Sequence, residues 1–125
     1  MGAERLEFIR SLGAHMAVDA SDAVEAVRGE MGGVDASIVF TARMAGFDLG
    51  LQLLRRGGLF VAVGIPATSE GNLELNPFEF FIRDPTLIYS AVGNVQDMRE
   101  LVDMAAAGQV KSHIGRSGTL SELHA

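Results

Sequence analysis

The sequence predicts an α/β fold in which the strands of a parallel sheet alternate with crossover helices. Apolar residues switch between helical spacing and short continuous runs, at about 20 to 25 residues per unit with short connections. The run 59–63 has no polar side chain on either face, which suits a parallel strand covered by helices on both sides. With 125 residues, 48% of them hydrophobic, the chain should form one domain, residues 1–125.

The first elements follow from apolar spacing and helix-ending glycines. Leu6, Ile9 and Leu12 share one side of a helix that Gly13 can end. The short apolar run 16–18 then predicts a strand.

A second helix should begin after residue 19 and end at the glycine pair 32–33. Asp19, Ser21 and Asp22 offer N-cap oxygens at its start. The apolar run 38–40 after it predicts a buried strand.

A third helix should follow this strand. Phe47, Leu51 and Leu54 have helical spacing, and the glycine pair 57–58 is expected to stop the helix before the 59–63 strand.

The C-terminal half continues the alternation. Asparagine followed by proline predicts the N-cap and first position of a short helix over 76–83. A strand is expected over 86–91, and a helix over 94–108 that asparagine opens and glycine closes. Residues 110–114 could form a further short strand, and 120–123 the start of another helix.

Composition excludes several kinds of function. The formal net charge of -6 disfavours a nucleic-acid partner, and the absence of cysteine excludes disulfides and thiolate metal sites. His15, His113 and His124 lack the spacing of a zinc site and are expected on the surface, so no bound metal is predicted. The longest apolar run is too short for a membrane span, and the N-terminus does not resemble a signal peptide. We therefore expect a cytoplasmic protein without a membrane partner.

Residues just after the strands are the candidates for a binding site. In open α/β sheets, ligands bind beyond the carboxyl ends of the strands. Small residues occur there at 40–42, 63–65 and 90–93, where they would let a flat ligand approach the backbone. By chemistry alone, these segments are more typical of ordinary strand-to-loop turns. The pair 57–58 precedes a strand and so is not a phosphate loop, and the sequence has no G-x-G-x-x-G.

Residues 55–66 (RRGGLFVAVGIP) resemble the medium-chain dehydrogenase/reductase family, especially its zinc-dependent alcohol dehydrogenases. Other stretches resemble the same family in the same order, and together they cover nearly the whole chain. They are residues 5–14, 33–39, 90–101 and 107–111.

The resemblance implies that this part of the chain binds the nicotinamide end of NAD or NADP. Arg5 matches a basic position that touches the adenosine ribose. The remaining expected cofactor-binding residues are Val63, Gly64 and Ile65 at the nicotinamide carboxamide, Ser90, Ala91 and Val92 beside them, and Phe40, Thr41 and Ala42 beneath the cofactor.

The same resemblance implies that much of the family's chain is missing. The catalytic zinc domain and the first two Rossmann strands, with the glycine loop, would precede Met1. We therefore expect a partial Rossmann-type sheet and an oxidoreductase fragment that is inactive alone. The alternative is a non-catalytic α/β module that associates with itself or with a partner chain. A methyltransferase remnant is a weaker third possibility, which the strand end at 63–66 disfavours.

Two absent strands would affect the sheet directly. In the Rossmann order 3-2-1-4-5-6 they separate the strand at 16–18 from the one at 36–40, leaving a gap of about 14 Å. The strand at 36–40 would become an exposed edge, and 86–91, which pairs across a two-fold axis in the family, would be the other. We expect either a rearranged sheet, with 16–18 moved or unpaired, or a homo-oligomer joined through strand edges.

Overall fold

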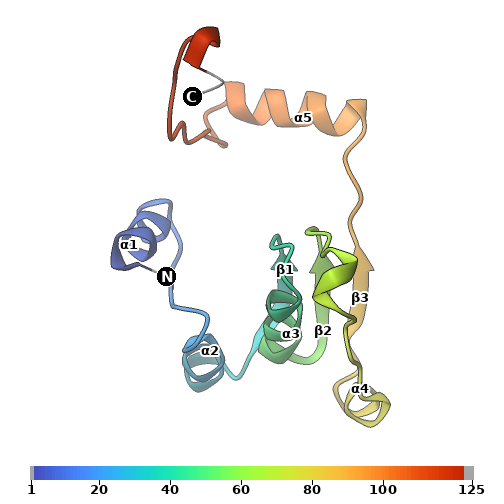
Figure 1. Ribbon diagram of the computed structural model, residues 1–125. Helices are drawn as coiled ribbons and strands as arrows, with labels where there is room; N and C mark the ends of the chain where they lie inside the picture. The colour runs from blue at the N-terminus through green and yellow to red at the C-terminus, as the bar shows by residue number, and fades with distance from the viewer. Residues whose placement is uncertain (1, 123–125) are drawn as a thin grey trace. The chain divides into compact units, whose positions relative to one another are not determined.

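The computed structural model describes residues 2–122 and separates the chain into a first unit that ends at Ala91 and a second that begins at Val92. The first unit contains a three-stranded sheet with helices beside it (Figure 1). Its elements are α1 (Ala3–Ser11), α2 (Ala23–Met31), β1 (Val34–Val39), α3 (Met44–Leu53), β2 (Leu54–Ala62), the 3-10 turn η1 (Thr68–Glu70), α4 (Pro77–Arg83) and β3 (Thr86–Tyr89).

The sheet is parallel throughout, with strand order β1-β2-β3. Val39 pairs with Ala62, and Ala62 pairs with Tyr89, so all three strands end at the same level. The predicted α/β class with a parallel sheet and crossover helices is confirmed. The carboxyl ends of the strands therefore meet at one edge.

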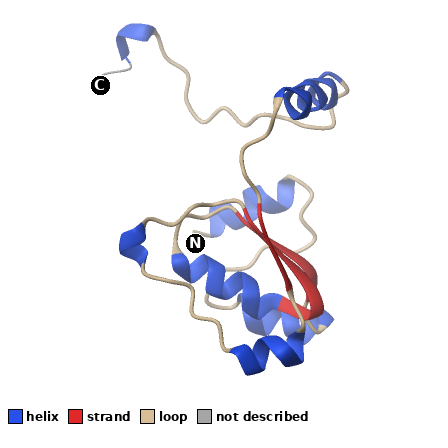
Figure 2. Ribbon diagram, turned by 90° about the vertical axis from the view of Figure 1, so that its right-hand side faces the viewer, coloured by secondary structure: helices blue, strands red, loops and turns tan. Residues whose placement is uncertain are grey.

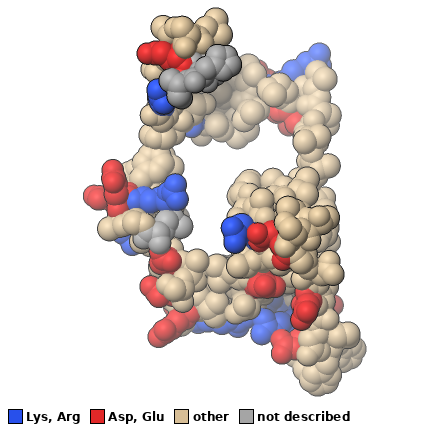
Figure 3. Space-filling model, viewed as in Figure 1, with Lys and Arg blue, Asp and Glu red and all other residues tan. Residues whose placement is uncertain are grey.

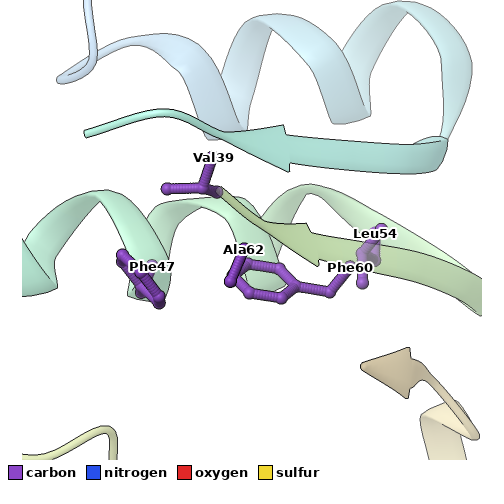
Figure 4. Packing of buried hydrophobic residues seen from close by; sticks show 5 residues of the cluster. All are labelled: Val39, Phe47, Leu54, Phe60 and Ala62. Carbon is purple, nitrogen blue, oxygen red and sulfur yellow. The ribbon is translucent and has the colours of Figure 1, made fainter. Parts of the chain in front are cut away.

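The hydrophobic core lies between α3 and one face of the sheet. Phe47 of α3 and Phe60 of β2 are the largest fully buried side chains, with ring centroids 5.8 Å apart. Val39, Leu54 and Ala62 complete this buried cluster (Figure 4). Phe60 and Ala62 alternate with Val61 along β2, so they share the face that α3 covers.

The opposite face of the sheet is not covered within the first unit. Figure 2 shows helices along one side of the strands. On the other face, Ile38 of β1 and Ile88 of β3 both pair with Val61 of β2, and both remain exposed. The prediction that helices cover both faces therefore holds for one face of this unit.

Arg28 ties α2 to the C-terminal end of α3. Its guanidinium donates to the carbonyl of Gln52 through Nε (2.9 Å) and Nη2 (2.5 Å), and to the carbonyl of Leu54 through Nη2 (3.1 Å). The last carbonyls of a helix lack partners within the helix, and a charged donor satisfies them well. Gly32 ends α2 in the left-handed conformation, as its position predicts. Asp22 is the N-cap residue of α2 but makes no side-chain cap.

The strand predicted at 16–18 is absent. This segment has no strand conformation, and among the described residues no neighbouring strand pairs with it. Its Ala17 is buried, and the Ala17 carbonyl accepts a hydrogen bond from Arg10 Nη2 at 2.8 Å. A strand needs a neighbour for its backbone groups, and here an arginine side chain satisfies one of them instead.

The boundary between α3 and β2 also differs from the prediction. Leu54 begins the strand rather than continuing the helix, because it pairs with Val34 and buries its side chain. The glycine pair 57–58 is therefore not a helix stop but part of an irregularity in β2. The register moves from Val34 opposite Leu54 to Ala36 opposite Leu59, and Gly57 takes a φ of 72° there.

Other predicted elements appear with altered limits. α4 begins as expected, with the Asn76 side chain accepting from the Phe78 amide at 3.0 Å and proline at the first helical position. β3 stops at Tyr89 rather than at residue 91. Within residues 2–122, no helix has the length and apolar character that a membrane span requires.

The second unit contains α5 (Val95–Ala106) and the 3-10 turn η2 (Leu120–Glu122). Asn94 and Asp97 form a reciprocal capping box, so the predicted helix and its N-cap are confirmed. Residues 110–114 do not form a strand.

Two hydrogen bonds from Thr119 lower the pKa of the Glu122 carboxyl. The backbone N–H of Thr119 has the larger effect and its hydroxyl the smaller. Leu123 and His124 lie outside the described residues.

Gly50 of α3 provides the first test of this packing. A Cβ atom there would lie 2.7 Å from Val39 Cγ2, 2.9 Å from Phe60 Cε2 and 2.9 Å from Ser37 Oγ. We expect Gly50→Ala to lower the free energy of unfolding in urea by about 1–3 kcal/mol, as overpacking of a core does. Gly29→Ala in α2 is the matched control, because no atom lies within 4 Å of its Cβ position. This control should be about 0.5–1 kcal/mol more stable than the wild type, and equal effects of the two changes would contradict the packing.

Candidate functional site

Three chain segments leave the sheet at the edge where the parallel strands end. Residues 40–42 follow β1, residues 63–65 follow β2, and residues 90–91 follow β3. Because the strands are parallel and end at the same register level, these segments lie in the order of the strands along one edge. The structure thus brings together the segments that the sequence singled out, as far as residue 91.

The ends of β1 and β2 are in direct backbone contact. The amides of Val63 and Gly64 both donate to the carbonyl of Val39, each at 2.9 Å. A Cβ atom on Gly64 would overlap the carbonyl oxygen of Thr41 and would lie 2.9 Å from that of Phe40. Only glycine leaves room for segment 63–65 to cross so close to segment 40–42. The residue type at position 64 therefore sets the distance between these two segments.

The end of β3 joins the same edge through one further hydrogen bond. The amide of Ser90 donates to the carbonyl of Ala62 at 2.8 Å, which extends the pairing one residue beyond Tyr89. The Ser90 hydroxyl makes a longer contact of 3.4 Å with the carbonyl of Ala91. Residues 90 and 91 are thereby held beside the end of β2.

This edge offers apolar surface and backbone groups rather than charge. The side chains of Phe40 and Ile65 are exposed there. Among the described residues, the backbone amides of Ile65 and Ala91 have no hydrogen-bond partner. Such an edge can bind a ligand through apolar contacts and through hydrogen bonds to the backbone.

Two charged residues that no sequence pattern indicated lie beside this edge. Glu70 Oε2 accepts from the backbone amide of Met44 at 3.2 Å and lies 3.1 Å from Arg43 Nε. The amide of Arg43 donates to Thr41 Oγ1 at 3.2 Å. Glu70 is far from Met44 in the sequence and occurs in a polar loop, so no local pattern could have revealed this contact.

Two of the expected residues are not part of this arrangement. Arg5 lies on α1, and no hydrogen bond or ion pair of its side chain within residues 2–122 reaches the strand ends. Val92 is the first residue of the second unit, so it is not part of the edge described in the first.

The described part of the chain shows no arrangement that suits a metal ion. The sequence contains no cysteine, and within residues 2–122 no three His, Asp or Glu side chains are grouped so that they could hold one. Acidic and basic side chains are interspersed over the face seen in Figure 3. The chemistry at the strand ends is therefore that of backbone and apolar groups.

Residues 1–107 match the family model described as "Zinc-binding dehydrogenase". The alcohol dehydrogenase of Moraxella sp. (strain TAE123) is 35% identical over 113 residues, which cover 89% of this chain and 32% of that protein. An alcohol dehydrogenase of Geobacillus stearothermophilus is 32% identical over 114 residues, covering 90% of this chain and 33% of the relative. The chain thus spans about a third of the length of the curated relatives it matches.

Solved structures show the same fold over most of the chain. The alcohol dehydrogenase of Aeropyrum pernix superposes with a TM-score of 0.78 at 29% identity, covering 87% of this chain and 31% of that one. A putative zinc-binding dehydrogenase from Sinorhizobium meliloti 1021, solved bound to NADP, gives a TM-score of 0.79 at 26% identity. It covers 89% of this chain and 34% of the other.

Substituting Gly64 tests the crossing at the strand ends. In Gly64→Ala the added methyl would overlap the Thr41 carbonyl, so the two segments must separate. We expect a loss of about 1–3 kcal/mol in urea unfolding and large changes in the amide chemical shifts of residues 39–42. Gly115→Ala is the control, because nothing lies within 4 Å of its Cβ position. Unchanged shifts at 39–42 in the folded Gly64→Ala protein would show that the segments do not touch.

Proposed function

The chain belongs to the zinc-binding dehydrogenase family, and from this premise we propose that it forms the nicotinamide side of the NAD(P) site of an oxidoreductase resembling alcohol dehydrogenases. The observation that carries the proposal is the meeting of the three strand ends around Gly64. Segments 40–42 and 63–65 cross there at backbone contact distance. Residue 90 pairs beside them with the end of β2. Ligands of open α/β sheets bind at such an edge.

The residues at this edge fit the nicotinamide ring of NAD or NADP. The exposed side chains of Phe40 and Ile65 supply apolar surface for the ring. The unpaired amides of Ile65 and Ala91 could donate to the carbonyl of the carboxamide. When bound, the cofactor supplies the hydride exchanged with an alcohol or carbonyl compound. The residues of this chain hold and orient the ring, and the NADP in the Sinorhizobium meliloti relative supports the choice of cofactor class.

The zinc implied by the family does not fit the residues that the structure describes. The sequence has no cysteine, and residues 2–122 contain no grouped set of His, Asp or Glu side chains that could form a zinc site. We therefore assign no zinc-dependent step to these residues. The contribution of this chain is binding and orientation, and we propose that it has no dehydrogenase turnover by itself.

A second candidate function is self-association as a non-catalytic module. β1 and β3 are both edge strands of the sheet, so each presents unpaired backbone groups. Ile38 and Ile88 add exposed apolar surface on the face that the first unit leaves uncovered. Together these features support a homo-oligomer joined through strand edges.

Reduced nicotinamide mononucleotide provides a direct test of the proposed cofactor site. We expect this half-cofactor to shift the amide NMR signals of residues 40–42, 63–65 and 90–91. ADP-ribose, which carries the other half of the cofactor, should leave these signals unchanged. The chain with NADH or NADPH should reduce no aldehyde. Turnover by the purified chain, or shifts confined to other residues, would contradict the proposal.

Light scattering during size-exclusion chromatography tests self-association. We expect the mass of the wild-type protein to exceed that of one chain and to fall on dilution. Ile88→Lys places a charge on β3 and should favour the monomer. Ile82→Lys on α4 is the matched control, since Ile82 is 50% exposed and Ile88 46%. A wild-type monomer at all concentrations, with a sharp two-state thermal transition, would reject the association.

A further inference from the structure

The connection after β2 folds back onto the start of α3. Arg43, the N-cap residue of α3, makes no side-chain cap of its own. The first amide of the helix, at Met44, instead donates to Glu70 Oε2 at 3.2 Å, across 26 residues of sequence. The 3-10 turn η1 brings Glu70 to this position. Glu70 thus accepts a hydrogen bond from the helix start, as an N-cap side chain would, although it is distant in the sequence.

The hydrogen bond from the Met44 amide contributes more to holding Glu70 in place than the ion pair with Arg43 does. The side chain of Arg43 is 78% exposed, whereas that of Glu70 is 25% exposed. An ion pair with one exposed partner contributes little, because water screens it. A carboxylate at a helix N-terminus satisfies an otherwise unpaired amide and interacts favourably with the helix dipole. We therefore attribute the attachment mainly to the bond with the Met44 amide.

Glu70 and Gly64 restrain opposite ends of the segment 40–43. Gly64 lies against the carbonyls of Phe40 and Thr41. Glu70 holds the other end, at Arg43 and at the helix start. Between them the Arg43 amide bonds to Thr41 Oγ1 at 3.2 Å. This segment should form the floor beneath the nicotinamide ring, so its position decides how well the ring is supported.

We propose that Glu70 is a positioning residue of the nicotinamide site, which fixes the floor segment 40–43 by capping α3. The inference rests on the proposed function, because it assigns Glu70 a role in that same site. Glu70 does not touch the ring. The connection that it anchors also lines a cavity of about 250 Å³, together with Met44, Phe47 and Tyr89. Releasing Glu70 would free both the connection and the helix start.

The affinity for reduced nicotinamide mononucleotide tests this role in the full chain. We expect Glu70→Ala to weaken binding about fivefold, which corresponds to roughly 1 kcal/mol, and to speed hydrogen exchange at the Met44 amide. Glu70→Gln keeps an oxygen acceptor and should bind within about twofold of the wild type. Glu74→Ala is the control, because it removes a carboxylate from the same connection and Glu74 has no ion-pair or hydrogen-bond partner among the described residues.

The outcomes separate this inference from the proposed function. A wild-type protein that does not bind the mononucleotide overturns both. Wild-type binding that Glu70→Ala leaves unchanged, with unchanged exchange at Met44, overturns the role of Glu70 alone. If Glu70→Ala does not fold, Glu70→Met replaces it, since methionine keeps the length and apolar stem of the side chain without a carboxylate. Equal weakening by Glu74→Ala would also reject the inference.

Discussion

The close approach of α3 to the sheet is the constraint on which the rest of the first unit depends. Gly50 permits it, since any side chain there would collide with Val39 and Phe60. The approach puts Phe47 against Phe60 and so forms the core. It also fixes where both ends of the helix lie. The C-terminal end becomes the acceptor for Arg28, and the N-terminal end lies beside the strand ends, where a carboxylate from the following connection reaches it.

The candidate site and the core are built from the same strands and helix, but they expose different chemical groups. The core is apolar and closed, whereas the strand ends carry exposed backbone groups and exposed apolar side chains. This division suits a protein that supports a cofactor, because the rigid part sets positions and the edge makes the contacts. The curated relatives are about three times as long as this chain.

Local signals in the sequence predicted most of the elements. The strands near 38–40 and 59–63 follow from apolar runs, and α4 and α5 from asparagine caps that the structure contains. The failures have a common physical origin in contacts between distant residues. The run 16–18 has strand composition but no pairing strand among the described residues, which agrees with the expectation that it could be left unpaired. Leu54 has helical spacing but pairs with Val34. The contact of Glu70 with the helix start spans 26 residues, so no pattern within either segment could reveal it. The three strand ends were predictable because parallel topology alone brings them together.

The irregularity in β2 has a consequence for how this fold can vary in length. It lies at the amino end of the strand, where the register changes between Leu54 and Leu59. Gly57 adopts the positive φ that this change requires. From Leu59 onward the pairing with β1 is regular to Ala62. Insertions or deletions among residues 55–58 would therefore be taken up before the regular pairing begins. Related chains could differ in loop length at that end of the sheet while the opposite end, with its crossing at Gly64, stays unchanged.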